Sequence, residues 1–366
     1  MRAAWRGWLL TAVLVPLASV VCGFAVGAIA IVAAGADPLT AYSALFAGAF
    51  TNHNALAETL VSTTPYVVLG LAVALGFRAG LFNIGAEGQF YIGSLSGVFV
   101  AYSIHGLPGF VEVPLGLLAG MLGGAFWASI AGALKARFGA HEVITTIMLN
   151  YVSFLVASYL VDTPGLMLAP HVSTPRTPDV DPGAVLPILV PGSRLHAGFV
   201  LALIAVPIVW FLIERTTIGF RLRAVGFNQG AARAAGISVG RTIVLTMALS
   251  GALAGLAGII QILGVNFHMT DTVAAGYGFD AIAVALLARS NPWAVLPAAF
   301  LFGALHNGAS FMQLETQVSS DLISIVQASV IIFVAAPAIV GWLFRLRRPP
   351  SETLLITQRG VDAPTT

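Results

Sequence analysis

Long apolar runs alternate with short polar segments along most of this chain. Because a helix needs about 20 apolar residues to cross the hydrocarbon core of a bilayer, each long run is a candidate membrane span. The pattern predicts ten spans in two sets of five. Their bounds are 9–34, 59–77, 83–103, 114–134 and 143–162, then 196–213, 242–265, 274–289, 293–311 and 321–344.

The composition indicates the same class of protein. Of the 366 residues, 58% are hydrophobic and 9% are charged, whereas soluble domains carry about 25% charged residues. We therefore expect an all-α integral membrane protein whose surroundings are the lipid bilayer. The net charge of +2 gives no support for a nucleic-acid partner. The single cysteine, Cys22, excludes an internal disulfide, and no spacing of ligating residues predicts a metal site.

The N-terminus has two alternative interpretations. Arg2 and Arg6 precede an apolar stretch, as in a signal peptide, but the stretch continues to about Ala34 and lacks a clear cleavage site. We therefore interpret it as an uncleaved first span. A lipoprotein signal ending at Cys22 is the less favoured alternative, because the apolar run continues well beyond that residue.

The basic residues are distributed asymmetrically about the predicted spans. With a cytoplasmic N-terminus, those that lie inside are Arg2, Arg6, Arg78, Lys135, Arg137, Arg215, Arg221, Arg223, Arg233, Arg241, Arg289, Arg345, Arg347 and Arg348. Only Arg176 and Arg194 then lie in outer loops. Because basic loops remain in the cytoplasm, we expect both termini there. Removing one span would reverse every later loop, which favours an even number.

We expect a single transmembrane domain, 1–348, followed by a disordered cytoplasmic tail, 349–366. Its halves are about 9–162 and 196–344, and the proline-rich segment 163–195 joins them as an external loop. Proline prevents that loop from forming a regular helix, but its length is sufficient for a cap or a docking surface.

Each predicted half contains five spans, and an odd number makes any repeat inverted in the membrane. The third span of each half also begins irregularly, at 80–89 and at 276–280, where glycines interrupt the apolar pattern. Alternation of the spans places the first break near the cytoplasmic face and the second near the outer face. The sequence thus predicts two inverted five-helix repeats.

The longest polar interruption is the segment 214–241, which contains five arginines and one glutamate between two predicted spans. Its first part begins with hydroxyl side chains suited to the N-cap of a helix. Thr216 or Thr217 would cap a short helix through Val225, and Gly226 would end it in a C′ position. We expect this segment to lie at the cytoplasmic membrane face.

The second part of this segment has a similar pair of signals. Asn228 would cap a helix over 229–235, and Gly236 would end it. Two short capped helices favour an ordered docking site, with Arg233 as a directed charge. The alternative is a basic loop that obeys the positive-inside rule and contacts only phospholipid.

A second polar motif, FNIGAEGQ at 82–89, begins a predicted span. Asn83, Glu87 and Gln89 are expensive in a membrane unless they face protein or water, so they are candidates for a polar path. Alternatively, Glu87 pairs with Arg78 and the two amides only join helices. Other polar or aromatic candidates within the spans are Asn150, Tyr277, Asp280, His306 and Asn307.

Common catalytic and nucleotide-binding motifs are absent from the sequence. It contains no Gly-x-x-x-x-Gly-Lys-Ser/Thr phosphate loop, so this chain does not bind ATP in that manner. It also contains no nucleophile elbow and no zinc-ligand spacing. We therefore predict no catalytic residue, no metal and no cofactor on this chain.

Three stretches carry a resemblance to a known family. They are FRAGLFNIGAEGQF at 77–90, GFRLRAVGFNQGAARAAGISV at 219–239 and GYGFDAIAVALLA at 276–288. Together they resemble the permeases of bacterial ABC importers for branched-chain amino acids, simple sugars and nucleosides, over essentially the whole chain. The wording FNIGAEGQ is most similar to the nucleoside or guanosine branch.

The resemblance implies partners and roles that the residues alone do not. It implies a multi-pass subunit of the bacterial inner membrane, working with a second permease, ABC ATPase subunits that bind ATP and Mg²⁺, and an external substrate-binding lipoprotein docked on the outer loop. The segment 214–241 would contain the coupling helix that contacts the ATPase. The residues assigned to coupling are Arg223, Gly226, Asn228, Ala232, Arg233 and Gly236. Those assigned to a substrate path are Asn83, Glu87, Gln89, Asn150, Tyr277 and Asp280.

Three other functions remain open at this stage. The same machinery could carry a simple sugar or a branched-chain amino acid, although RSNPW at 289–293 departs from the glycine-rich stretch of sugar permeases. An autonomous transporter could use Glu87 and Asp280 as proton sites. A membrane scaffold without transport is the third alternative.

Overall fold

The computed structural model describes residues 15–270, 273, 276–319 and 321–335. Most of these residues are helical, and one isolated bridge joins Ile188 and His196. The first group of helices is α2 (Val15–Ala33), α3 (Pro38–Phe50), α4 (His53–Arg78), α5 (Ala86–Ser103), α6 (Gly109–Phe138) and α7 (Glu142–Asp162). The second group is α8 (Gly198–Arg215), α9 (Thr217–Phe227), α10 (Gln229–Ala234), α11 (Val239–Gln261), α12 (Tyr277–Leu287), α13 (Pro292–Thr316) and α14 (Asp321–Ala335). Two short elements complete the described part, the 3₁₀ turn η2 (Pro182–Ala184) and the π-helical turn η3 (Ile262–Asn266).

The all-α class is confirmed for the described residues, whereas the count of ten spans remains a prediction. Six of the described helices are long and apolar enough to cross a membrane, namely α4, α6, α7, α8, α13 and α11 continued by η3. Helices α2, α3 and α12 are apolar but shorter. The predicted outermost spans extend beyond the described residues at 15 and 335, and the tail 349–366 lies outside them.

Helix α3 was not predicted. It lies between the first two predicted spans, in the interval from 34 to 59. Asp37 caps this helix by accepting hydrogen bonds from the Leu39 and Thr40 backbone N–H groups, and Pro38 occupies its first turn. Asn52 then caps α4 through the Ala55 N–H. The cap signals were present in the sequence, but the helix between them is shorter than a membrane span.

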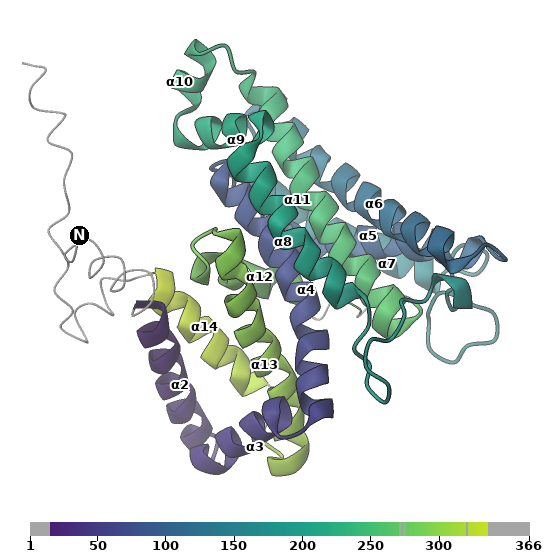
Figure 1. Cartoon of the computed structure of the whole chain (residues 1–366), viewed down its shortest axis with the longest axis vertical. Helices are drawn as coiled ribbons and strands as arrows, with labels where there is room; N and C mark the ends of the chain where they lie inside the picture. Colours follow the sequence, from purple (N-terminus) through teal and green to yellow (C-terminus); the bar gives the residue numbers. More distant parts are fainter. Residues whose placement is uncertain (1–14, 271–272, 274–275, 320, 336–366) are drawn as a thin grey trace, which may run out of the picture.

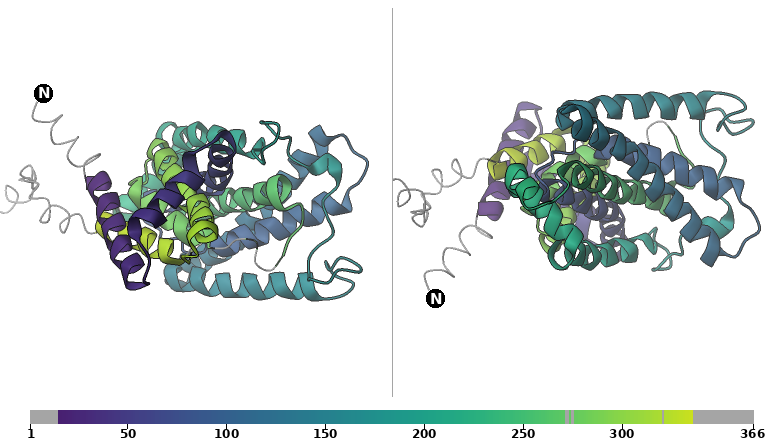
Figure 2. Two further views of the ribbon diagram at one scale, coloured as in Figure 1. Left: turned by 90° about the horizontal axis from the view of Figure 1, so that it is seen from below. Right: turned by 90° about the horizontal axis from the view of Figure 1, so that it is seen from above.

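Helix α4 is buried along most of its length and forms the centre of the bundle. Helices α5, α8, α11, α12 and α13 pack around it. Seen end-on, α2 lies beside α14 at one edge of the molecule, and α5, α6 and α7 lie toward the opposite edge (Figure 2). The central position of α4 places its C-terminal residue, Arg78, where several helices meet.

Glycines let α6 and α11 approach each other closely. A Cβ atom at Gly124 would collide with the Gly251 carbonyl oxygen, and one at Gly255 would collide with the Gly120 carbonyl oxygen. Small residues at these four positions replace side-chain contacts with direct backbone packing, as is common between membrane helices. This interface therefore forms a rigid part of the bundle.

The two ends of the bundle differ in structure. Helices α9 and α10 lie at one end, and the segment 163–197 lies at the other (Figure 1). That segment is pinned onto the helix ends, because the Val180 N–H donates to the Phe267 carbonyl and the Asp181 N–H donates to the Ala101 carbonyl. The Gly183 N–H and the nearby His105 hold the pKa of Asp181 below its usual range. The proline-rich loop is thus an ordered cap over α5 and η3.

The two irregular span starts lie together, which corrects the prediction that they lie at opposite faces. Glu87, in the first turn of α5, accepts a hydrogen bond of 3.0 Å from the Gly276 N–H at the start of α12. From this point α5 runs toward the segment 163–197, and α12 runs toward the end that carries α9. Residues 79–85 lead the chain back into the bundle before α5 begins, which counting apolar runs could not reveal.

Candidate functional site

The platform, defined as α9, α10 and the link 235–238, is held in shape by its caps. The Thr216 hydroxyl accepts a hydrogen bond from the Gly219 N–H at 3.1 Å, and the Asn228 side chain accepts one from the Ala231 N–H at 2.9 Å. Gly236 has a φ of +79°, which suits the end of a helix and favours glycine. The predicted caps of both short helices and the glycine stop of the second are therefore confirmed.

The predicted stop of the first short helix at Gly226 is wrong. Helix α9 continues through Gly226 to Phe227 and ends where Asn228 becomes extended, with a φ of −159°. A Cβ atom at Gly226 would lie 2.5 Å from the Arg78 carbonyl oxygen and 2.7 Å from the Ala79 carbonyl carbon. This glycine thus allows the platform to pack against the end of α4. The two segments are far apart in the sequence, so local sequence signals could not predict this contact.

The exposed and buried sides of the platform differ from the prediction. Arg233 is exposed, as a docking residue should be, but Ala232 is buried and accepts a hydrogen bond from the Ile237 N–H. Phe227 at the tip of α9 is 95% exposed and Phe220 is 61% exposed. The sequence analysis missed these aromatic residues. Phe227 had a local signal, an aromatic side chain just before the cap of the second helix in a polar segment.

Arg223, which was assigned to coupling, is engaged within the chain. Its guanidinium pairs with Glu214 at the end of α8, and Arg78 at the end of α4 lies 3.5 Å from the same carboxylate. The Arg78 Nε also donates a hydrogen bond of 2.9 Å to the Ser290 carbonyl, just after α12. This ion-pair network joins the platform to α4, α8 and the C-terminal end of α12. The suggested pairing of Arg78 with Glu87 is therefore wrong.

The amides of the polar motif form a buried hydrogen-bond cluster. The Asn83 amide donates to the Gln89 side chain and to the Ser250 hydroxyl, each at 2.9 Å, and Gln89 donates back to Asn83 at 3.0 Å. Asn150 accepts from the Gly88 N–H and donates to the Ile84 carbonyl. These buried side chains form their hydrogen bonds with other groups of the chain. The structure therefore does not support their predicted place on a substrate path. The alternative, that the amides join helices, fits this geometry.

Glu87 is 3% exposed and is held by the start of α12. In addition to its contact with the Gly276 N–H, its second carboxylate oxygen accepts a hydrogen bond from the Gly278 N–H. The positive end of the helix dipole and these donors stabilise negative charge at this place. Glu87 thus joins the starts of α5 and α12.

Tyr277 and Asp280 belong to a different cluster, in which aromatic rings lie beside a carboxylate. The Tyr66 hydroxyl donates a hydrogen bond of 2.9 Å to Asp280, and the Tyr277 hydroxyl lies 3.4 Å from the His306 Nε2. The rings of Tyr66 and Tyr277 meet edge to face, with centroids 5.1 Å apart. Tyr66 was not among the predicted site residues, because a lone tyrosine within an apolar span gives no distinctive signal.

A cavity of about 300 Å³ opens beside this cluster, between α12, α13 and α14. Its lining is Asp280, His306, Ala309, Ser310, Asp321, Ile323, Ser324 and Gln327. Six of these eight side chains are polar, which is unusual between helices of this hydrophobicity. We call this cavity the polar pocket. Of the predicted path residues, Asp280 lines it and Tyr277 adjoins it through His306.

A bundle of long apolar helices, with a folded polar platform at one end and a polar pocket between its helices, is the architecture of a multi-pass membrane protein. Comparison with protein families gives the same class. Residues 55–335 match the family described as the permease component of branched-chain amino acid transport systems, and the chain belongs to this family.

Several curated proteins are similar to this chain over most of its length. The guanosine ABC transporter permease protein NupP of Bacillus subtilis is 42% identical over 89% of this chain and 94% of its own. The nucleoside ABC transporter permease protein NupB of Lactococcus lactis is 36% identical over 90% and 92%. A glucose ABC transporter permease protein of Haloferax volcanii is 37% identical over 95% and 92%. No solved structure matches the chain significantly.

Proposed function

We propose that this chain is the membrane-spanning subunit of an ATP-driven importer that moves nucleosides into the cell. The family membership supports the permease role, and the names of two similar proteins, for guanosine and for nucleosides, support the substrate class. The observation that carries the proposal is the combination of a capped, outward-facing platform with a polar pocket in one bundle. The location that follows is the bacterial cytoplasmic membrane.

The platform is the surface that would contact a partner ATPase. Phe227 is exposed at the end of α9 and Arg233 is exposed on α10, so the platform offers a partner both an aromatic side chain and a positive charge. Exposed aromatic and arginine side chains contribute most to the affinity of many protein interfaces. ATP and Mg²⁺ would bind to that partner, because this sequence has no phosphate loop. The platform would then lie in the cytoplasm, as the positive-inside rule favours.

The polar pocket is the part of this chain suited to a nucleoside. Its volume of about 300 Å³ lies at the lower end of the range of small-molecule sites. The His306 imidazole lines the pocket and can lie against a purine ring, and the Asp280 carboxylate can accept hydrogen bonds from ribose hydroxyls or from base N–H groups. The Tyr66 hydroxyl, which donates a hydrogen bond to Asp280, would hold the carboxylate in position for this contact.

The way in which the two halves interlock supports transport by alternating access. Helix α6 of the first half packs on α11 of the second, and α13 of the second half packs on α4 of the first. Helices α5 and α12 begin at one point and run in opposite directions, as inverted repeats would. We infer that the halves rock about this point. A second permease and an external binding protein would complete the transporter, the latter on the ordered cap 163–197.

A sugar is the second candidate substrate, because one similar protein is a glucose permease. Competition uptake separates the candidates. In proteoliposomes that contain the complete importer, excess guanosine and then other nucleosides should displace a labelled nucleoside, whereas glucose and leucine should not. Displacement by glucose alone would assign the sugar class. Measuring the binding of each competitor to the external binding protein in parallel would show whether selectivity arises in that protein or in this chain.

A further inference from the structure

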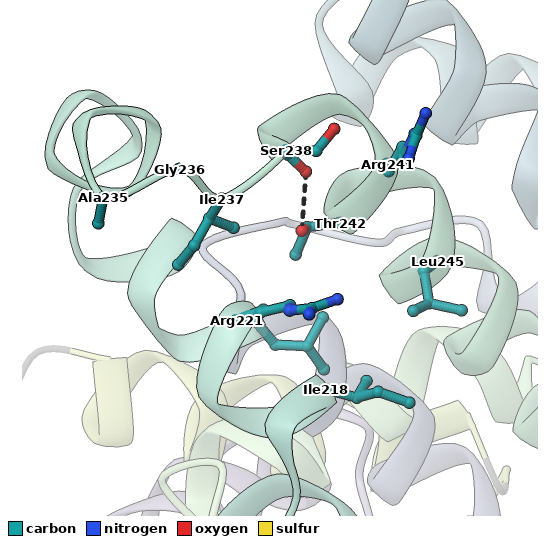
Figure 3. A pocket seen from close by; sticks show the side chains of 10 residues that line it. Ile218, Arg221, Ala235, Gly236, Ile237, Ser238, Arg241, Thr242 and Leu245 are labelled. Atoms are coloured by element: carbon teal, nitrogen blue, oxygen red, sulfur yellow. Dashed lines mark hydrogen bonds between the residues drawn. The ribbon is translucent and has the colours of Figure 1, made fainter.

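A second cavity, which the transport cycle described above does not use, lies beneath the platform. It has a volume of about 410 Å³ and lies between α9, the link 235–238 and the start of α11 (Figure 3). Its lining is Ile218, Arg221, Leu222, Ala235, Gly236, Ile237, Ser238, Arg241, Thr242 and Leu245. We call it the basic pocket.

The charge of the basic pocket is not balanced by this chain. Arg221 and Arg241 are both exposed, and neither has an ion-pair partner among the residues that the structure describes. The other nearby basic residues do have ion-pair partners. Arg78 and Arg223 both pair with Glu214, and Lys135 pairs with Glu142. The lining itself contains no aspartate or glutamate. Two uncompensated guanidinium groups thus border one cavity.

The start of α11 adds further positive potential. This helix has 23 residues, and Ser238 at its N-cap makes no side-chain capping hydrogen bond. The first N–H groups of α11 therefore have no side-chain acceptor at that position, beside Arg241 and the cavity (Figure 3). Arginine groups next to a helix N-terminus form a strong binding site for a phosphate.

Apolar side chains on the same two helices form another part of the wall, which narrows the choice of phosphate ligand. Ile218 and Leu222 line it from α9, and Leu245 lines it one turn along α11 from Arg241. Leu245 is 41% exposed on a helix long enough to span the membrane. A free phosphate would make no use of this apolar wall. A phospholipid would, since its phosphate lies at the membrane surface and its acyl chain follows the helix.

We propose that the basic pocket binds the headgroup of an anionic phospholipid, with the phosphate between Arg221 and Arg241 and an acyl chain along Leu245. The bound lipid would link α9 to α11 and so stiffen the base of the platform. The proposal does not depend on the nature of the transported substrate.

The test is native mass spectrometry of the full-length chain released from nanodiscs of phosphatidylglycerol and phosphatidylcholine. The wild-type chain should retain phosphatidylglycerol and release phosphatidylcholine. Arg221→Gln with Arg241→Gln should weaken retention of phosphatidylglycerol by roughly 30-fold, the effect of two arginine contacts with an anionic headgroup. The matched control, Arg137→Gln with Arg215→Gln, removes two exposed cytoplasmic-end arginines outside the pocket and should retain the lipid.

Three results would overturn the proposal. Equal retention of phosphatidylglycerol by the pocket variant and the wild type would show that the arginines do not hold it. Displacement of the lipid by millimolar inorganic phosphate would identify a site for a soluble anion. Stoichiometric displacement by the partner ATPase would assign the pocket to protein docking. Arg221→Lys with Arg241→Lys guards against misfolding, because it preserves charge and should retain partial binding.

Discussion

The Glu87 carboxylate accepts a hydrogen bond of 3.0 Å from the Gly276 N–H, although the two residues are far apart in the sequence. This contact joins the first turn of α5 to the first turn of α12, and the Gly278 N–H supports it through the other carboxylate oxygen. Both helices therefore start from one buried point in the bundle. A carboxylate suits that point because the start of α12 presents N–H donors to it.

Replacing Glu87 should affect stability more than substrate binding. In Glu87→Gln the side-chain NH₂ faces backbone N–H donors, so about 1–3 kcal/mol of stability should be lost. Thermal unfolding of the detergent-purified chain measures this loss, and the KM for nucleoside uptake should stay within about twofold. Glu315→Gln, at an exposed glutamate of α13, is the control. A large rise in KM without loss of stability would place Glu87 on the substrate path instead.

Phe227 should be an anchor for the ATPase. Truncation to alanine removes a 95% exposed aromatic ring from the platform tip without disturbing internal packing. We expect the affinity for the ATPase to fall roughly 30-fold, as for a central aromatic residue of an interface. Surface plasmon resonance with the permease in nanodiscs measures this affinity. Phe138→Ala, which removes a 72% exposed ring at the end of α6, should change it little. An unchanged affinity in Phe227→Ala would exclude this anchor.

Glu214 should transmit movement of the platform to the bundle. It holds both Arg223 of the platform and Arg78, which in turn contacts Ser290 after α12. Glu214→Gln removes the charge that joins them, so the ATPase should still bind while more ATP is hydrolysed for each nucleoside transported. The ratio of ATP hydrolysis to uptake in proteoliposomes measures this effect. Arg215→Gln, next to it but outside the network, should keep the wild-type ratio. Normal coupling in Glu214→Gln would refute this role.

Tyr66 should support substrate binding through Asp280. Tyr66→Phe removes the hydroxyl that donates a 2.9 Å hydrogen bond to the carboxylate, while the ring remains. We expect the KM for nucleoside uptake to rise roughly tenfold, equivalent to about 1.4 kcal/mol. Tyr159→Phe removes a hydroxyl from a 64% exposed tyrosine on α7 and serves as the control. Equal KM values for the two variants would mean that the polar pocket is not on the path.

Local signals predicted part of this architecture well. The cap at Asn228 and the stop at Gly236 depend only on neighbouring residues and were predicted correctly, and of the two candidates for the other cap, Thr216 and Thr217, the structure selects Thr216. Gly226 was misinterpreted, because its role depends on the carbonyl of Arg78, a distant residue in the chain. Helix α3 was missed for a different reason: its cap at Asp37 is local, but its 13 residues are fewer than a membrane span needs.

The candidate site was harder to predict than the fold. A polar residue within an apolar span has the same appearance whether it binds substrate or a neighbouring helix. Asn83 and Gln89 satisfy each other, whereas Asp280 adjoins a cavity. Only the three-dimensional packing of the helices shows whether such a residue bonds to a neighbouring helix or faces a cavity. The resemblance to a family indicated the function, but it could not show which of these residues contact substrate and which only join helices.

The most direct test of the central claim is guanosine uptake by proteoliposomes with ATP enclosed on the side of the platform. The account requires this chain, its partner ATPase, a second permease and the external binding protein together to give ATP-dependent uptake. This chain alone should give none, even with a proton gradient. Uptake by the chain alone, driven by the gradient and unchanged by ATP, would contradict the account and identify an autonomous proton-coupled transporter.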